Sequence, residues 1–452
     1  MQGILLAFAL EISIAKAFSE DELDSLSGIA ITAIEEISKE VKVVALSRKF
    51  LRSASIVFLI GRGSYDDPVE GCACLSNRMR LRLTSTLSPL ELQAFIDQLG
   101  ATVDAVTYRD VMFLRAQVTP KRVKECLGFL AELFTSPRFP VAEVAKEKTS
   151  QKIEYEKIRQ DPMTASVEDA WEATFPMSPL GHPVTGYPET IEKLTPQTLE
   201  NFDADTVKKA PLVIGIVGPQ DEKKLIDLAI SSFSGIGKNR QQPRSFALRR
   251  RRDFNIVTRP LEVKQTTFSL GMITSGVSSS EYPTLLLIED YLGSDRRYTG
   301  VLFRELREKR GLTYFAYSRL SAFRDHGLLT AFAGVEHKKV LEALSLMLES
   351  IVQLRDKLVP EKEIKEIRTF HKRAVRMALE APSQAATWLA GNVYRGGEVD
   401  FASYFSKIDA VSSEAVRRVA GEFLVPSRMS LSVAGKPPEE ESLMDMLKET
   451  VE

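Results

Sequence analysis

The feature that most constrains this fold is an internal repeat within the 452-residue chain. Several landmarks of the first half recur in the same order in the second half, at an offset of 217 to 220 residues. The matched pairs are 121–127 with 338–344, Pro140 with Pro360, 194–197 with 411–414, and the strand-like run ending at Gly218 with the run ending at Gly435. Several landmarks in one order indicate a duplication, and a unit of about 200 residues is too long for a solenoid repeat.

The duplication predicts two homologous α+β domains, at 41–235 and 258–440, because a chain of this length is too long for a single core. A helical extension is expected at 1–40, a basic linker at 236–257 and a C-terminal tail at 441–452. Strands come singly and in hairpins, and helices come in pairs. This pattern favours a mostly antiparallel sheet with helices on one face over a doubly wound parallel sheet.

Local patterns predict individual elements. Strands are expected at 41–46, 54–60 and 211–218, a hairpin at 101–106 and 111–118, and helices after Thr119-Pro120 and after Pro140. The clearest helix start is Ser88-Pro89-Leu90-Glu91, which combines an N-cap serine, a proline in the first turn and a glutamate three residues after the cap. We expect this helix to end at Gly100.

Composition excludes several functions. The formal net charge of -1 leaves no electrostatic footprint for nucleic acid, and we interpret the four arginines at 249–252 as a solvated linker. Three cysteines exclude a disulfide framework and a four-cysteine zinc site, and the four histidines lie far apart. The apolar run at 1–17 is shorter than the ~20 residues of a membrane span, so no span is expected. A cytoplasmic location is favoured, and a periplasmic, secreted or mitochondrial one stays open.

A second informative stretch, 71–79, follows the strand at 54–60 and reads Gly-Cys-Ala-Cys-Leu-Ser-Asn-Arg-Met. Its surroundings carry further landmarks: Gly63-Ser64, Leu99-Gly100-Ala101, Pro188-Glu189-Thr190-Ile191, the run Phe-Arg-Glu-Leu-Arg-Glu-Lys-Arg-Gly-Leu-Thr-Tyr at 303–314, and Gly435. With these landmarks the chain resembles the insulinase-like, or pitrilysin-like, metallopeptidase family over residues 41–440. That family includes the mitochondrial processing peptidase and the core proteins of respiratory complex III. The resemblance implies two homologous domains arranged as half of a clamshell.

Active members of that family carry a His-x-x-Glu-His motif at this place, with a further glutamate downstream as the third zinc ligand. The resemblance puts Cys74 and Arg78 at the histidine positions, Asn77 at the general base and Glu154 at the third ligand. An arginine has no lone pair for a metal and an asparagine takes no proton from water, so this chain is expected to hold no metal. We predict that Arg78 replaces the metal charge and pairs with Glu154. The alternative is that both are solvated helix residues.

The resemblance also implies that an arginine and a tyrosine seven residues apart, from the second half, hold the substrate over a zinc site. Arg307 and Tyr314 have this spacing. The alternative interpretation is an ordinary basic helix end capped by Gly311, followed by a strand aromatic. The preceding segment, 293–300, has only two glycines, fewer than the glycine-rich loop of presequence receptors in the family.

These features together predict a non-catalytic subunit of a two-chain zinc metallopeptidase. It would form a heterodimer with a homologous chain that holds the zinc, and would offer Arg307 and Tyr314 in trans to unfolded or short peptides. Such substrates would lie extended along a sheet edge. Two alternatives stay open, a structural scaffold like the complex III core proteins and a stand-alone peptide-binding homodimer.

Overall fold

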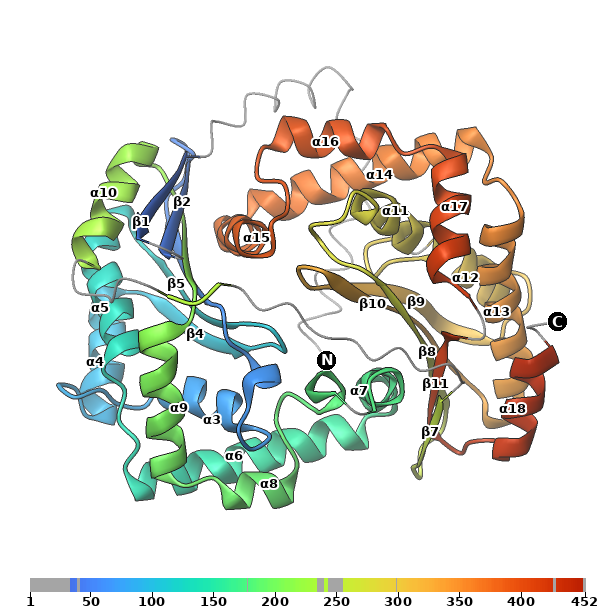
Figure 1. The fold of residues 1–452 in the computed structure, drawn as a ribbon, viewed down its shortest axis with the longest axis horizontal. Coiled ribbons are helices and arrows are strands. Elements are labelled where there is room, and N and C mark those ends of the chain that lie inside the picture. Colours follow the sequence, from blue (N-terminus) through green and yellow to red (C-terminus); the bar gives the residue numbers. More distant parts are fainter. Residues whose placement is uncertain are drawn as a thin grey trace.

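The computed structural model describes residues 33–38, 41–176, 178–233, 240–242, 255–297, 299–425 and 428–449. These residues form two β-sheets, each surrounded by helices, with one sheet in each half of the molecule (Figure 1). The arginine run at 249–252 and most of the predicted linker lie outside the described residues. No helix among the described residues is long and apolar enough to cross a membrane.

Apart from β1, which has no counterpart among the described strands of the second sheet, the two sheets share one strand order, which confirms the duplication. The order is β1-β2-β6-β3-β5-β4 in the first sheet and β7-β11-β8-β10-β9 in the second. β2 pairs with β6 in parallel, β7 pairs with β11 in parallel, and the other pairs are antiparallel. The strands are β1 Ala33–Ser38, β2 Val41–Ser47, β3 Ala54–Ile60, β4 Thr102–Thr107, β5 Met112–Val118, β6 Leu212–Gly218, β7 Asn255–Pro260, β8 Thr266–Ser275, β9 Thr313–Ala322, β10 His326–Val335 and β11 Ser430–Gly435.

The helices repeat in the same way. In order, α5, α6, α7 and α9 correspond to α13, α14, α15 and α17. The helices of the first half are α3 Cys72–Met79, α4 Pro89–Leu99, α5 Val123–Thr135, α6 Val141–Gln160, α7 Pro162–Thr174, α8 Pro188–Lys193, α9 Pro196–Lys209 and α10 Glu222–Ser232. Those of the second half are α11 Tyr282–Leu292, α12 Val301–Phe303, α13 Val340–Asp356, α14 Glu361–Glu380, α15 Pro382–Arg395, α16 Phe401–Asp409, α17 Ser413–Phe423 and α18 Glu440–Glu449. The predicted capping box opens α4, where Ser88 and Glu91 exchange hydrogen bonds.

The two halves exchange one helix each. α7 lies between β5 and β6 of the first sheet in the chain but packs on β7, β8 and β11 of the second sheet, and α15 packs on β2, β3 and β6 of the first. The approach of α15 is so close that a Cβ at Gly215 would lie 2.6 Å from the Ala386 carbonyl oxygen. The sheets therefore carry helices on both faces rather than on the one face expected, and every residue of β3 and β6 is buried.

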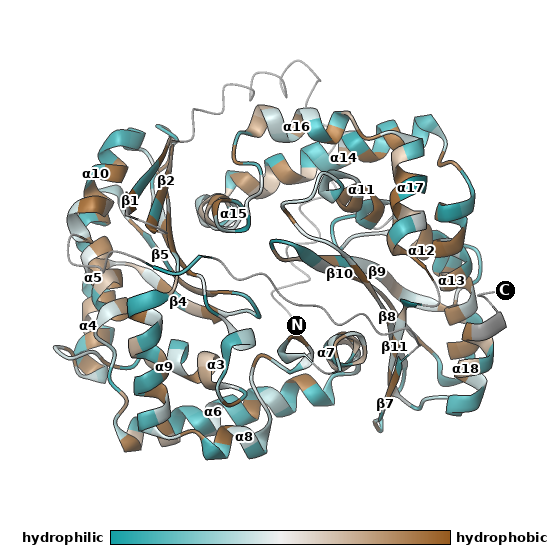
Figure 2. Cartoon of the chain, in the orientation of Figure 1, coloured by the Kyte–Doolittle hydropathy of each residue, from teal (hydrophilic) through white to brown (hydrophobic). Residues whose placement is uncertain are grey.

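Apolar residues of the first sheet, of α15 and of the second half form one continuous core, and Figure 2 shows brown segments in the strands and along the helices of both halves. A second core lies between the other face of the first sheet and its own helices. Because α15 belongs to the chain of one half and to the core of the other, the two halves are packed as one unit.

The secondary structure near both ends of the described chain differs from the prediction. Residues 33–38, assigned to the helical extension, form β1, because β2 offers its free edge for antiparallel pairing. Residues 1–32 lie outside the described part of the chain. Much of the expected tail is helix α18, whose Leu443 and Leu447 are buried in the core at i, i+4 spacing.

Candidate functional site

The degenerate motif lies on α3, which is fixed at its start by a partly buried carboxylate. Asp67 accepts hydrogen bonds from Gly71 N at 2.7 Å and from Ala73 N at 2.6 Å, so it binds the free amides of the helix N-terminus. From α6, Gln151 Nε2 donates to Gly71 O and to Thr185 O. Gly71 itself has φ +92°, a conformation that L side chains rarely adopt. These contacts hold α3 against α6, as seen in Figure 1.

Arg78 bridges two carboxylates of α6. Its Nε donates to Glu147 Oε2 at 2.9 Å, and its Nη1 donates to Glu154 Oε2 at 2.5 Å. The predicted pair of Arg78 and Glu154 is confirmed, and the alternative of two separately solvated side chains is wrong. Burial alone would lower the pKa of Arg78, but the hydrogen bond to Glu147 and the nearby carboxylates outweigh burial and raise it. The guanidinium is therefore a permanent cation at this place.

Glu147 is the partner that sequence reasoning missed. Its side chain is 4% exposed, against 49% for Glu154, and it also pairs with Arg82. Glu147 precedes Glu154 by seven residues, which is two helical turns, so both carboxylates project from one face of α6. That spacing was a usable signal. The sequence did not show that Glu147 is the more deeply buried of the two carboxylates.

Cys74 and Asn77 have structural roles in the packing of α3. Cys74 is buried, and burial raises the pKa of its thiol to about 12, so the metal-binding thiolate is disfavoured. Asn77 is fully buried, and its Nδ2 donates to Val106 O at 3.1 Å and to Phe113 O at 3.3 Å. It therefore ties α3 to the β4–β5 hairpin.

A hydrolytic zinc site needs three ligands with free lone pairs and an open position for water. Arg78 offers no lone pair, the Cys74 thiol stays protonated, and the Asn77 amide is engaged with backbone. Among the residues that the structure describes, no three His, Cys, Asp or Glu side chains are grouped to hold a metal ion. The residues at these positions do not fit zinc, and Arg78 supplies the positive charge beside the carboxylates.

Arg307 lies in one backbone irregularity and Tyr314 lies in another. Residues Arg304–Glu308 form a π-helical turn, with Lys309 N donating to Arg304 O. β9 contains a β-bulge, since Gly334 pairs with Phe315 while Val335 pairs with Thr313, which leaves Tyr314 without a partner on β10. Tyr314 is 74% exposed. Irregularities of both kinds are enriched at functional sites, where they redirect side chains.

The Arg307 guanidinium lies over the Tyr314 ring, 5.0 Å from its centroid, and 5.6 Å from that of Phe303. Its Nη1 donates to Thr313 O at 3.1 Å. Gly311 has φ +63° and caps the helical end, as the alternative interpretation expected, but that interpretation gave no reason for the stacking. This pair belongs to the second half and the Arg78 cluster to the first, so the chain places its candidate residues in two groups (Figure 1).

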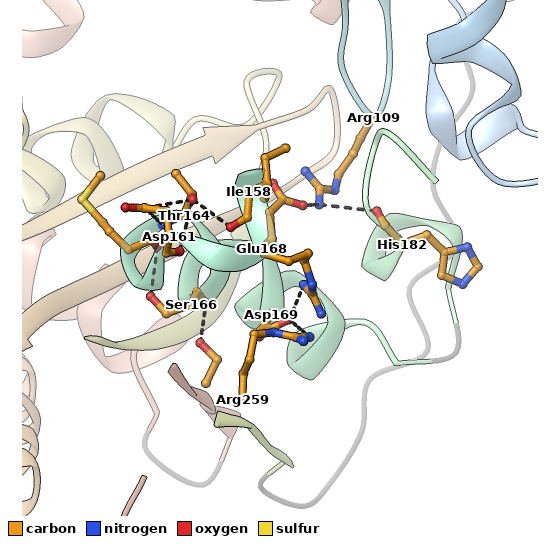
Figure 3. A network of polar contacts seen from close by, with 12 residues as sticks. Arg109, Ile158, Asp161, Thr164, Ser166, Glu168, Asp169, His182 and Arg259 are labelled. Carbon is orange, nitrogen blue, oxygen red and sulfur yellow. Dashed lines mark hydrogen bonds and ion pairs between the residues drawn. The ribbon is translucent and has the colours of Figure 1, made fainter. Parts of the chain in front are cut away.

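The β4–β5 turn holds both exchanged helices, and we name its residues Arg109 and Asp110 the hairpin clasp. Arg109 donates to Glu168 of α7 at 2.8 Å and lies 4.1 Å from the Trp171 ring centroid (Figure 3). Asp110 accepts two hydrogen bonds from Arg395 of α15, at 2.8 and 2.9 Å. The clasp therefore fastens the first sheet to both of the helices that link the two halves.

A second anchor of α7 is Asp169, which is fully buried and accepts from Arg159 at 2.6 Å and from Arg259 of β7 at 2.8 Å (Figure 3). Burial raises the pKa of Asp169 to about 6 despite these arginines. Sequence reasoning identified neither this anchor nor the clasp, because most of their partners, such as Arg259 and Arg395, are distant in the chain.

The duplicated α+β fold with a degenerate motif on α3 defines a peptidase-type half-shell. Residues 42–187 match the family model described as "Insulinase (Peptidase family M16)", and residues 193–370 match "Peptidase M16 inactive domain". The chain belongs to this insulinase family, as the sequence landmarks predicted.

Known relatives agree with this assignment. The "uncharacterized zinc protease YmxG" of Bacillus subtilis (strain 168) is 25% identical over 390 residues, which cover 84% of this chain and 92% of the relative. The solved "peptidase M16 inactive domain from Pseudomonas fluorescens" has a TM-score of 0.80 at 19% identity and covers 90% of this chain and 99% of its own. A chain of "Complex III2 from Candida albicans" has a TM-score of 0.75 at 17% identity, with 91% and 97% covered. The two structures establish similarity of fold.

Proposed function

We propose that this chain is the non-catalytic subunit of a two-chain zinc metallopeptidase. Its partner is a homologous chain with an intact His-x-x-Glu-His motif, and its substrates are unfolded or short peptides. The observation that carries the proposal is the contact of Arg307 with the exposed Tyr314 ring, built by a π-turn and a β-bulge. In the same chain, α3 carries a guanidinium at a metal-ligand position. A purely structural scaffold has no need for such a stack.

The chemistry of the stack suits a carbonyl that gains negative charge. A zinc ion held by the partner's His-x-x-Glu-His motif would supply Lewis-acid polarisation of the scissile carbonyl and an activated water. From this chain, the Tyr314 hydroxyl donates a hydrogen bond to the developing oxyanion, and the Arg307 charge lies beside it. The loss of one such donor typically costs about 10² to 10³ in kcat. Because the Thr313 carbonyl and two aromatic rings hold Arg307, little reorganisation accompanies the reaction.

The test is co-expression with the homologous zinc-motif chain of the same genome, followed by hydrolysis of fluorogenic peptides. Tyr314→Phe keeps the ring that stacks on Arg307 but removes the hydroxyl, and we expect kcat to fall about 100-fold. Arg307→Lys keeps the charge but loses the planar stack, and a loss of similar order is expected. The matched controls are Tyr108→Phe, at a side chain 47% exposed on the β4–β5 turn, and Arg310→Lys, in the same basic run.

Each outcome decides between functions. If the complex cleaves peptides equally well with Tyr314→Phe and Arg307→Lys, the in-trans role is wrong. If the partner binds but neither wild type nor variants cleave any peptide, the scaffold function is favoured. If no zinc-motif chain co-purifies and the protein forms a homodimer that binds peptides, the stand-alone binding function is favoured.

A further inference from the structure

The β-bulge in β9 decides where Tyr314 points. Ala316 and Ala333 are paired across β9 and β10 and face the core, and Val335, two residues after Ala333, faces it as well. If the ladder continued regularly, Tyr314 would pair with Val335 and point into that core. The bulge puts Thr313 opposite Val335 instead and leaves Tyr314 outside, 74% exposed.

The Thr313 hydroxyl lies at the centre of this bulge. Thr313 is 4% exposed, and its Oγ1 lies 2.6 Å from Gly334 O and 2.6 Å from Phe315 O. The same oxygen accepts a hydrogen bond from Phe315 N at 3.0 Å. A hydroxyl supplies one donor and two acceptor positions, so it serves backbone groups where the extra residue disrupts the ladder. Buried backbone groups left without such a partner are costly.

The backbone of Thr313 contacts Arg307, the other member of the pair. Its carbonyl oxygen accepts the hydrogen bond from Arg307 Nη1 at 3.1 Å. One residue therefore contacts Arg307 through its carbonyl and stabilises the exposure of Tyr314 through its hydroxyl. Gly334 supports this arrangement, because a Cβ there would lie 2.5 Å from the Phe315 ring.

We propose that Thr313 is the positioning residue of the Arg307–Tyr314 pair: its hydroxyl selects the bulged form of β9 that presents Tyr314, and its carbonyl holds Arg307. The catalytic consequence rests on the proposed function above. The structural consequence does not, since it concerns the conformation of the isolated chain.

The isolated chain gives the first test. In wild type, the amide of Phe315 is expected to exchange with solvent as slowly as that of Ala316, because the Thr313 hydroxyl holds it. With 3-fluorotyrosine at position 314, Thr313→Ser is expected to keep the wild-type ¹⁹F resonance and Thr313→Val to shift it. The matched control is Thr330→Val, which removes an equally buried hydroxyl that bonds Arg319 O in the regular part of the same ladder, and it is expected to leave the resonance unchanged.

The second test uses the complex with the zinc chain. Thr313→Val is expected to lower kcat by about 10- to 100-fold with little change in KM, as a displacement of about 1 Å at a reacting group does. Thr313→Ser restores the rate, and Thr330→Val lowers the melting temperature without changing the rate.

Three results overturn the proposal: fast exchange of the Phe315 amide in wild type, an unchanged ¹⁹F resonance in Thr313→Val, or a serine variant that behaves like the valine variant. The first measurement and the serine variant remain informative even if Thr313→Val does not fold. If Thr313→Val shifts the resonance while Tyr314→Phe leaves hydrolysis unchanged, Thr313 positions the pair and it is the proposed function that fails.

Discussion

Arg78 is predicted to stabilise the fold mainly through Glu147 and only weakly through Glu154. The two contacts are alike in kind, but the Glu147 side chain is 4% exposed and that of Glu154 is 49% exposed. Replacement by methionine keeps the aliphatic stem and removes the charge. It leaves Glu147 in a buried position with Arg82 as its remaining charged partner.

The expected magnitude follows from these exposures. Removal of one partner from a buried ion pair costs about 3–5 kcal/mol, and an exposed pair contributes about 0–1 kcal/mol. Glu147 keeps Arg82, so about half of the buried value applies, roughly 2 kcal/mol. Arg78→Met is therefore expected to lower the free energy of unfolding by about 2–3 kcal/mol, with most of the coupling to Glu147.

The assay is a double-mutant cycle that pairs Arg78→Met with Glu147→Gln and, separately, with Glu154→Gln. Urea unfolding is followed by the fluorescence of Trp171 on α7 and Trp388 on α15, the two tryptophans of the chain. The exposed pair of Arg115 and Asp104, with side chains 30% and 51% exposed, is the matched control cycle and is expected to couple by less than about 1 kcal/mol. A coupling of Arg78 to Glu154 as large as that to Glu147, or a neutral Arg78→Met, would refute the reasoning.

Three further predictions concern the clasp, a buried acid and the metal. Asp110→Asn leaves Arg395 without its carboxylate and is expected to cost about 3–5 kcal/mol in urea unfolding, whereas Asp104→Asn on the same hairpin costs at most about 1 kcal/mol. Burial raises the pKa of Glu289 to about 8, against roughly 4.3 when unfolded, so stability from the protonated form is lost as pH rises from about 4 to 8. Glu289→Gln is expected to remove this decline from a series of melting temperatures, and an unchanged slope would contradict the assignment. The double variant Cys74→His, Arg78→His frees Glu154 as a third ligand and is expected to gain about 2.7 kcal/mol of stability at a zinc concentration of 100 Kd, where wild type gains none.

The sequence predicted the features that depend on local pattern. Strand periodicity and the Ser88 capping box involve residues close in the chain, the duplicated landmarks are short local patterns that recur, and the structure confirms all three. The Arg78–Glu154 pair was also predictable, because the resemblance puts both residues at ligand positions of one site. The resemblance supplied the fold that brings α3 beside α6, and this contact depends on that packing.

The features that escaped prediction depend on contacts between distant residues. The burial of Glu147 arises when α3 packs on α6, and the clasp on Arg395 and the exchange of α7 and α15 arise when the halves pack. The bulge at Tyr314 escaped for a different reason. A regular strand and a bulged one have the same local propensity, and the Thr313 hydroxyl bonds backbone groups of both β9 and β10 at the bulge.

The helix exchange has a consequence for synthesis on the ribosome. The first sheet is complete once β6 has emerged, but the helix that covers its second face, α15, spans Pro382–Arg395 and emerges more than a hundred residues later. During that interval the face around Gly215 is exposed and able to bind other apolar surfaces, which is a known route to aggregation. A fragment that ends near residue 235 is therefore expected to bind chaperones and to become soluble when a fragment carrying α15 is supplied separately. Until translation is almost finished, the first sheet therefore lacks the helix of the C-terminal half that covers its apolar face.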